Sequence, residues 1–281
     1  MRRLLPLLLL IASPNVHAAC EEVLFTPALA GIETIPTCPL GSEDCLYSGE
    51  AVFRYAEAIP DDPAAMGITA QGSPWRLYGP DNRILTLDFL AKAVRGAQSE
   101  GEKKVVLVTS WSGVAPSAGV SSLADQLSKA LDGFPVEGQD GFLWISPEGR
   151  TRTTQQAYSV REGAGSYGVP SDKEVFVPLA AGWAAQVVAT ADAPLEPELV
   201  LAAGVGWDAF SLCPTRALEM FERAGHLGLA IGAYNAAQML LARGREGDRE
   251  AALQWLRKAA AAGDQPAAEQ LASLTTPKES S

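Results

Sequence analysis

The chain has 281 residues and carries 33 acidic against 22 basic side chains, a formal net charge of −11. An acidic surface repels phosphate backbones, so we expect no nucleic-acid partner. No segment beyond the first twenty residues is apolar over the roughly 20 residues that a membrane-spanning helix needs, so we expect no membrane span. The length suits one or two domains.

The first twenty residues are typical of an export signal. Arg2 and Arg3 precede a short apolar run, and small residues follow as far as Cys20. We expect residues 1–18 to be a signal peptide that is cleaved after Ala18, and the protein to be periplasmic. A lipoprotein signal with Cys20 as the lipid-anchored residue is the alternative.

Four cysteines are disulfide candidates in an oxidising compartment: Cys20, Cys38, Cys45 and Cys213. Four cysteines allow three connectivities, and the sequence does not choose among them. No two of them have the Cys-x-x-Cys spacing, so neither a thioredoxin-type redox motif nor a zinc ribbon is indicated.

Residues 19–190 have the alternating pattern of an α/β or α+β domain. Apolar spacing, turn signals and β-branched runs predict a helix over 86–98, a strand over 105–109, a small-residue loop over 110–119, a helix over 121–131, a strand over 141–146 and a return strand over 151–160.

The composition changes near residue 190. Residues 191–212 begin with prolines and small residues and are interpreted as a linker. Residues 213–275 are dominated by Ala and Leu with charged side chains, which predicts an all-helical module. Residues 276–281 are expected to be a disordered tail.

An internal similarity lies within this helical part. Residues 217–224 (Ala-Leu-Glu-Met-Phe-Glu-Arg-Ala) align with residues 252–259 (Ala-Leu-Gln-Trp-Leu-Arg-Lys-Ala), and Gly228 matches Gly263 at the same offset. A period in the thirties, with two helices and small-residue turns in each unit, predicts stacked helical hairpins.

Residues 233–241, Gly244 and residues 248–264 resemble a Sel-one-like repeat, a relative of the tetratricopeptide repeat. The resemblance covers roughly residues 215–273 and departs in its turn, where the family has a longer Gly-x-Gly segment. It implies protein–protein binding or scaffolding and no catalytic residues. A plain helical bundle that only completes the fold is the alternative.

Five side chains of this module are the expected contacts to a partner protein: Tyr234, Asn235, Gln238, Trp255 and Arg257.

Histidine content limits the chemistry. The chain has two histidines, and His17 leaves with the signal peptide, so His226 in the helical part remains. The α/β domain therefore lacks the histidine of a Ser-His-Asp or Cys-His catalytic set. Zinc catalysis that uses several histidines is excluded for the same reason. We expect no cofactor and no metal.

Residues 105–113, 123–131 and 141–149 faintly resemble caspase-like α/β domains. Ser110 stands where that family has its cysteine nucleophile, and no histidine precedes it. The resemblance therefore implies a catalytically inactive copy that is kept for binding.

Other motifs are weaker. Residues 163–168 fit Gly-x-Gly-x-x-Gly, but Pro170 follows where a dinucleotide site opens a helix. The acidic pairs Glu43–Asp44 and Asp61–Asp62 could serve glycoside hydrolysis, although adjacent carboxylates in polar loops are usually solvated. A hydrolase that uses Ser110, Ser112 or such a carboxylate pair stays open.

We expect an exported protein-binding or scaffold protein rather than a conventional enzyme. Its partner is another protein, and its oligomeric state is open. A narrower hypothesis is an immunity-type role, in which the protein neutralises a secreted toxin; the export signal, the repeat and the acidic charge motivate it.

Overall fold

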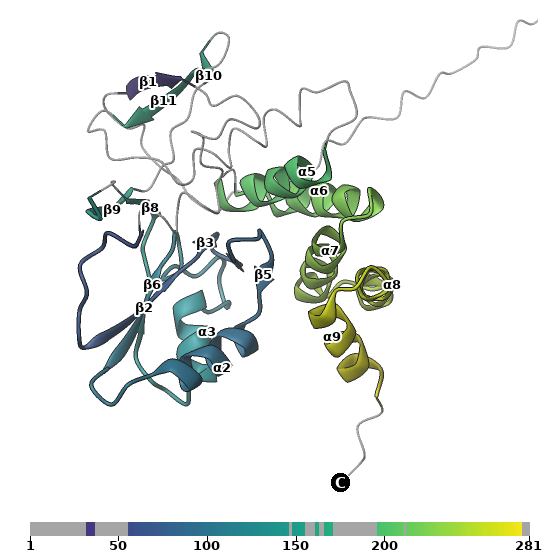
Figure 1. Ribbon diagram of the computed structural model, residues 1–281, viewed down its shortest axis with the longest axis horizontal. Coiled ribbons are helices and arrows are strands. Elements are labelled where there is room, and N and C mark those ends of the chain that lie inside the picture. The colour runs from purple at the N-terminus through teal and green to yellow at the C-terminus, as the bar shows by residue number, and fades with distance from the viewer. Residues whose placement is uncertain are drawn as a thin grey trace, which may run out of the picture.

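A computed structural model of the chain describes residues 32–36, 56–145, 148–154, 161–162, 166–170, 196–210 and 212–276. A sheet region (residues 56–154) precedes a helical region (residues 196–276), as Figure 1 shows. This order of a sheet-containing part and an all-helical part confirms the coarse fold prediction. Among the described residues, no helix has both the length and the apolar character that crossing a membrane requires.

The sheet region is built on three parallel strands in the order β2 (Ala65–Thr69), β6 (Lys104–Val108) and β7 (Val136–Glu137). Parallel neighbours need crossover connections, which here contain α2 (Leu87–Ala97) and α3 (Leu123–Ala130). Val105 and Leu107 are fully buried and pack with both helices in one apolar cluster. The sheet thus has its core on the face that these helices cover.

Both predicted helices begin at a side-chain cap. The Thr86 side chain accepts a hydrogen bond from the Phe89 amide (3.2 Å), and the Ser122 side chain accepts one from the Asp125 amide (3.1 Å). Such caps satisfy amide groups that the first helical turn leaves unpaired. The predictions of a helix over 86–98 and of a helix over 121–131 are confirmed by α2 and α3.

Two antiparallel units flank the parallel sheet. One consists of β3 (Gln71–Gly72), β4 (Leu77–Tyr78) and β5 (Ile84–Leu85), and it lies between β2 and α2 in the chain. The other pairs β8 (Phe142–Ile145) with β9 (Thr151–Thr154). The predicted return strand over 151–160 is confirmed as far as Thr154. A separate sheet is formed by β1 (Ile32–Pro36), β11 (Ser166–Pro170) and β10 (Arg161–Glu162).

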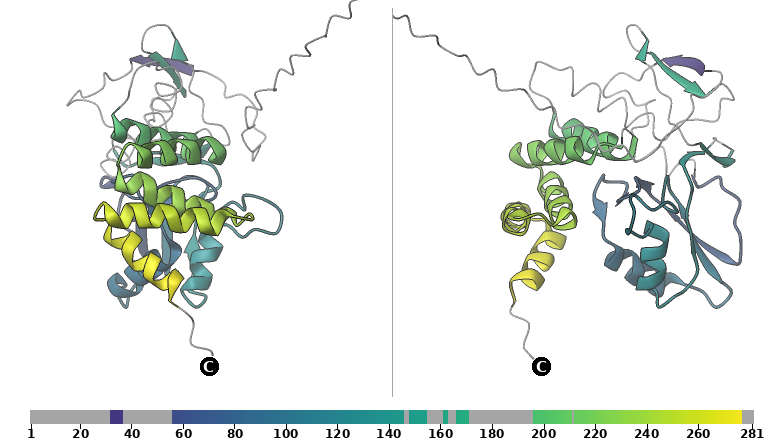
Figure 2. Two further views of the ribbon diagram at one scale, coloured as in Figure 1. Left: turned by 90° about the vertical axis from the view of Figure 1, so that its right-hand side faces the viewer. Right: turned by 180° about the vertical axis from the view of Figure 1, so that it is seen from behind.

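The helical region contains five α-helices and one π-helical turn. They are α5 (Pro197–Val205), the π-helix η1 (Gly206–Phe210), α6 (Pro214–His226), α7 (Ala230–Arg243), α8 (Asp248–Ala261) and α9 (Gln265–Thr275). Each α-helix packs against the next one along the chain, which Figure 2 shows from two further directions.

The interpretation of residues 191–212 as a linker was wrong for residues 196–210. These residues form α5 and η1, and Leu199 through Val205 are all buried. Pro197 occupies the first helical turn, where its missing N–H costs nothing. Because α5 is enclosed on every side, its apolar residues form a continuous run rather than a stripe, and only the prolines before it resembled a linker.

The turns after α6 and α8 have the same backbone geometry. Gly228 and Gly263 have φ of +100° and +89°, in the left-handed region that favours glycine. Leu229 N donates to Ala224 O, and Asp264 N donates to Ala259 O, which is the long hydrogen bond of a Schellman cap. The matched glycines of the sequence therefore end equivalent helices. The assignment to a repeat family stays a prediction.

Small residues let α6 and α7 approach closely. A Cβ added at Gly232 would lie 2.8 Å from the amide nitrogen of Gly225 and 2.7 Å from the Cβ of Ala224. Backbone atoms cannot move aside as the end of a flexible side chain can, so this contact requires glycine.

We predict that Gly232→Ala lowers the free energy of unfolding by about 1–3 kcal/mol, because the added methyl group forces the two helices apart. Urea unfolding followed by circular dichroism measures it. Gly96→Ala is the matched control, since Gly96 is an exposed glycine of α2 whose added Cβ meets nothing within 4 Å. That control should leave stability unchanged or raise it by up to about 1 kcal/mol. Equal effects of the two substitutions would contradict the packing argument.

Candidate functional site

A buried carboxylate joins the two regions. Asp208 of η1 has no exposed surface and accepts four hydrogen bonds from the β3–β4 hairpin. The donors are Ser73 Oγ (2.7 Å), Tyr78 OH (2.8 Å), Arg76 Nε (3.1 Å) and Arg76 Nη2 (2.7 Å). A buried charge is tolerated only when it is paired and hydrogen-bonded, as this one is. The hairpin is therefore anchored to the helical region at this point.

The protonation of these donors is firmly set. Burial opposes the positive charge of Arg76, but the adjacent Asp208 carboxylate raises the pKa of the guanidinium above its ordinary value. Burial, followed by the charge of Asp208, raises the pKa of the Tyr78 hydroxyl well above its ordinary value. Both groups thus keep their protons and remain donors to Asp208 at neutral pH.

A second contact holds the β4–β5 turn against α7. The buried amide of Asn235 accepts a hydrogen bond from Ile84 N (2.9 Å) and donates one to Asn82 O (2.8 Å). Between these two residues, Arg83 donates to both carboxylate oxygens of Asp264 (3.1 and 2.6 Å). The Arg83 guanidinium also lies 4.8 Å from the ring centre of Tyr234. This face of the helical region therefore holds a chain segment by its backbone and by one arginine.

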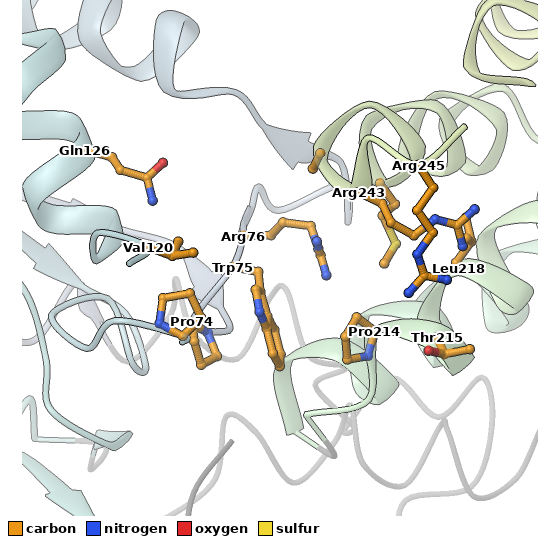
Figure 3. A pocket seen from close by; sticks show the side chains of 13 residues that line it. Pro74, Trp75, Arg76, Val120, Gln126, Pro214, Thr215, Leu218, Arg243 and Arg245 are labelled. Carbon is orange, nitrogen blue, oxygen red and sulfur yellow. The ribbon is translucent and has the colours of Figure 1, made fainter. Parts of the chain in front are cut away.

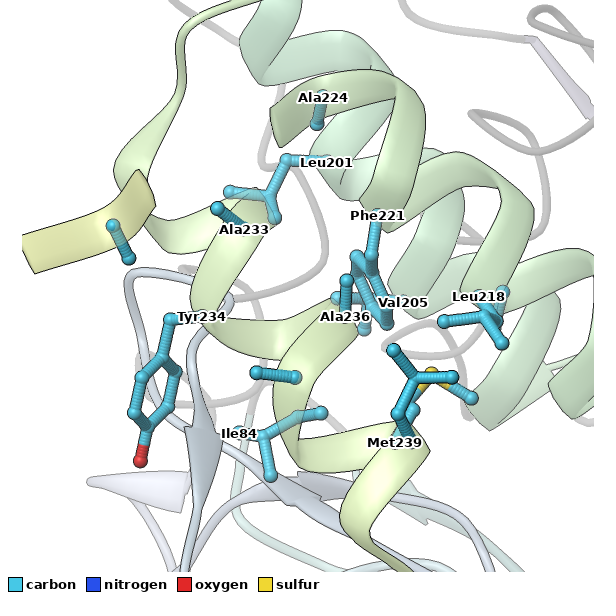
Figure 4. Packing of buried hydrophobic residues seen from close by; sticks show 14 of the residues in the cluster. Ile84, Leu201, Val205, Leu218, Phe221, Ala224, Ala233, Tyr234, Ala236 and Met239 are labelled. Atoms are coloured by element: carbon cyan, nitrogen blue, oxygen red, sulfur yellow. The ribbon is translucent and has the colours of Figure 1, made fainter. Parts of the chain in front are cut away.

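Strands β4 and β5 also contribute side chains to the core of the helical region. Ile84 and Tyr78 belong to the apolar cluster formed by α5 to α9. Figure 4 shows Ile84 beside α7, among the side chains of this cluster. The two regions therefore share a core at this contact.

A cavity of about 310 Å³, here called the interdomain cleft, opens beside these contacts. Both regions line it, with Pro74, Trp75, Arg76, Pro116, Val120 and Gln126 from the sheet region and Pro214, Thr215, Leu218, Met239, Ala242, Arg243 and Arg245 from the helical region. Figure 3 shows Trp75 and Arg76 across the cleft from Pro214, Arg243 and Arg245. The described lining contains three arginines and no acidic residue, in a chain of net charge −11.

The three arginines are held differently. Arg76 is fixed by Asp208, and Arg243 donates through Nε (2.8 Å) and Nη2 (2.6 Å) to Asp248. The main-chain amide of Arg245 also donates to Asp248 (2.8 Å). Within the described residues, the guanidinium of Arg245 makes no hydrogen bond or ion pair. Among the described residues, the cleft thus has two arginines fixed by carboxylates and one, Arg245, whose guanidinium is not hydrogen-bonded.

The five predicted contact residues lie on two helices. On α7, Tyr234 and Asn235 hold the chain's own hairpin, and Gln238 pairs with Gln270 of α9 (Gln270 Nε2 to Gln238 Oε1, 3.1 Å). On α8, Trp255 is half-buried and Arg257 is exposed. The five residues therefore do not form one open surface.

The two serines of the hydrolase alternative, Ser110 and Ser112, make hydrogen bonds to main-chain groups. Ser110 Oγ accepts from Leu143 N (2.9 Å). The fully buried Ser112 Oγ donates to Thr109 O (2.9 Å) and accepts from Gln139 N (3.0 Å). His226, the sole histidine of the described residues, is exposed at the end of α6 and makes an edge contact with Trp255.

Other sequence-predicted positions are only partly described. Asp61 and Asp62 are exposed, and Asp62 accepts a hydrogen bond from Ala64 N (2.9 Å). Gly168 lies in strand β11, so the described residues directly after the glycine motif, up to Pro170, are extended rather than helical. In the described ranges, no group of three or more His, Cys, Asp or Glu side chains is arranged to hold a metal ion. The predicted signal peptide and the pair Glu43–Asp44 lie outside these ranges.

Cys213 is fully buried at the start of α6 and is disulfide-bonded. The other candidates Cys20, Cys38 and Cys45 lie outside the described residues. Their pairing with Cys213 is therefore left open among the three connectivities.

Sequence reasoning missed the residues that join the two regions: Ser73, Arg76, Tyr78, Arg83, Asp208 and Asp264. One signal was present for Asp208, which is a lone acidic residue in the apolar stretch from 199 to 210. A charge inside a buried run requires a partner. The sequence does not reveal that the partner comes from a hairpin more than a hundred residues earlier.

A family model described as "Domain of unknown function (DUF8616)" matches residues 42–153. The match includes the three-stranded unit β3 to β5, whose turns carry Arg76 and Arg83, and the helical region lies outside the match. No curated protein matches the chain. No solved structure matches it either. The interdomain cleft therefore lies between the matched part and a helical part beyond the match.

We predict that Asp208→Ala destabilises the protein by about 3–5 kcal/mol, because it leaves the buried Arg76 charge without its partner. Urea unfolding measures the loss. Asp132→Ala is the control, since Asp132 forms an exposed ion pair with Arg95 and its side chain is 88% accessible. Pairs of that kind contribute at most about 1 kcal/mol. If both variants unfold alike, the interpretation of Asp208 as the anchor is wrong.

We also predict a pH-dependent contribution from Asp248. The hydrogen bonds from Arg243 lower the pKa of Asp248 to about 2, from an ordinary value of 3.8. The folded state therefore favours the ionised form, and the stabilisation is present above about pH 4 and is lost as the pH falls toward 2. The melting temperatures of the wild type and Asp248→Asn should differ at pH 5–7 and converge between pH 4 and 2. When both proteins also carry Arg243→Ala, the difference between their melting temperatures should change less with pH. A difference between wild type and Asp248→Asn that is the same at every pH would contradict the assignment.

Proposed function

We propose that this protein is an exported protein-binding protein whose partner contacts the interdomain cleft. One observation carries the proposal. The helical region already holds a chain segment in cis, through the Asn235 amide on the backbone and through Asp264 and Tyr234 on Arg83. Recognition of a segment by its backbone and one anchoring side chain is a general way in which proteins bind peptides.

The in-cis contact also explains why the cleft, rather than the α7 face, is the proposed binding surface. Tyr234 and Asn235 are engaged by the hairpin. The hairpin fixes the sheet region beside the helical region, and the cleft lies between them. Trp75 and Val120 supply apolar surface, and the arginines supply charge. A cleft between two regions is a common location for binding sites.

The surroundings of Ser110 and Ser112 support the hydrolase alternative less well than they support the binding function. The Ser112 hydroxyl is buried and is hydrogen-bonded to main-chain groups, and Ser110 Oγ accepts from a main-chain amide. A nucleophilic serine requires an adjacent base and an accessible oxygen. We also keep the periplasm as the location and the narrower immunity-type role as parts of the proposal. Capture of a toxin as the partner would support the immunity-type role.

Partner capture with matched variants tests this function. Purified wild-type protein is used as bait in an envelope extract of the cells that produce it, with bound proteins quantified by mass spectrometry. We expect one protein to be enriched, and its recovery to fall at least about tenfold with Trp75→Ala and with Val120→Asp, because both side chains line the cleft. Val120 is 45% exposed, so its substitution should not disturb the core.

Arg257→Ala provides the comparison, because Arg257 is exposed on α8 and is not a cleft residue. Recovery of the partner should be unchanged. Loss of the partner with Arg257→Ala alone would move the binding surface to α8. Enrichment of no protein over an empty resin would contradict the proposed function.

A further inference from the structure

We propose that the interdomain cleft binds a carboxylate-bearing, acidic segment of the partner protein, with Arg245 as the contact that is free to engage it. This inference rests on the proposed function and gives the partner a chemistry.

The charge of the lining is opposite to that of the whole chain. Acidic residues outnumber basic ones by 33 to 22, yet the described lining has arginine at three positions and neither aspartate nor glutamate. The carboxylates of Asp208 and Asp248 lie behind the lining, bonded to Arg76 and Arg243. They offset part of the positive charge. The charge of Arg245 also acts on Asp248, but among the described residues its guanidinium makes no hydrogen bond or ion pair, so its donors stay open to a ligand.

The two paired arginines are fixed in place while keeping donors for a ligand. Each uses Nε and Nη2 on its carboxylate, as the hydrogen bonds of Arg76 and Arg243 show. A guanidinium has five N–H donors, so Nη1 of each carries two that these bonds do not use. Figure 3 shows Arg76 reaching from the sheet region toward Arg243 and Arg245 on the helical side. Arginines that are already ordered lose less entropy when a ligand binds.

The start of α6 adds to the positive potential. Pro214 and Thr215 line the cleft at the first turn of this 13-residue helix, which has no side-chain cap. A helix N-terminus carries a partial positive charge and has main-chain amides without helical partners. The uncapped helix end and the three arginines therefore favour the same kind of ligand, an anion.

The apolar part of the lining distinguishes a peptide from a small inorganic anion. Trp75 and the exposed Val120 present apolar side chains that a phosphate ion cannot use, whereas an acidic segment with apolar neighbours can use both kinds of surface. The volume of about 310 Å³ is at the lower end for ligand pockets, which suits a few side chains of a partner. Arginine also binds carboxylates through paired hydrogen bonds, which gives the recognition its geometry.

The test is fluorescence anisotropy with a labelled peptide of about six alternating leucine and glutamate residues, titrated with the purified protein. A second peptide has glutamine in place of each glutamate. We expect saturable binding of the acidic peptide, at least about tenfold tighter than that of the glutamine peptide. Binding should weaken as ionic strength rises, because the contact is exposed and electrostatic. Equal binding of the two peptides, or no binding, would overturn the inference.

A charge-matched pair of variants separates the cleft from the overall charge of the protein. Arg245→Glu should weaken binding of the acidic peptide at least about tenfold. Lys103→Glu makes the same change in net charge at an exposed position just before the central strand β6, outside the cleft lining, and should change affinity less than about twofold. If the two variants weaken binding equally, the attraction is nonspecific and the inference fails.

Inorganic phosphate serves as the competitor. Competition only at concentrations far above that of the peptide supports a peptide site, and displacement at equal concentrations would overturn it in favour of a general anion site. The partner-capture experiment distinguishes this inference from the proposed function. A partner that is lost with Trp75→Ala but retained with Arg245→Glu refutes the acidic-segment inference and leaves the proposed function in place. Peptide binding without any captured partner counts against the proposed function alone.

Discussion

The buried carboxylate of Asp208 is the constraint on which the relation between the two regions depends. It lies in the π-helical turn after α5 and is satisfied by donors of the β3–β4 hairpin. An isolated ionised carboxylate in a protein interior is strongly unfavourable. The helical region can therefore bury Asp208 at low cost only when the hairpin of the sheet region is in place. The bidentate pair with Arg76 also fixes the direction of approach, because both groups are planar.

The contact at Asn235 and Asp264 reinforces this arrangement and shapes the surface. Arg83 and its neighbours occupy α7 around Tyr234 and Asn235. The described residues leave the cleft beside Trp75 and Arg245 open between the regions, and also a cavity of about 560 Å³ whose lining includes Phe89, Lys92 and Gln270. The surface of α7 around Tyr234 and Asn235 thus contacts the β4–β5 turn of the same chain instead of a partner. A partner is therefore expected to bind in the cleft, where both regions have side chains that these intramolecular contacts leave accessible.

Local elements were largely predictable, because their causes are local. The spacing of apolar residues predicted α2 and α3, and the β-branched run after Lys104 predicted β6. The matched glycines Gly228 and Gly263 predicted two equivalent helix ends. The linker prediction failed because α5 is buried on all sides and so lacks the one-sided pattern by which a helix is recognised.

The sequence by itself determined the order of a sheet-containing part and a helical part, the acidic net charge and the scarcity of histidine, since each is a property of local pattern or composition. The tertiary structure alone decided which residues meet. Ser73 and Asp208 are 135 positions apart, and Arg83 and Asp264 are 181 positions apart. No local propensity encodes such pairings, because they depend on how whole elements pack. The cleft and its three arginines exist for the same reason: they come from two parts of the chain that only folding places side by side.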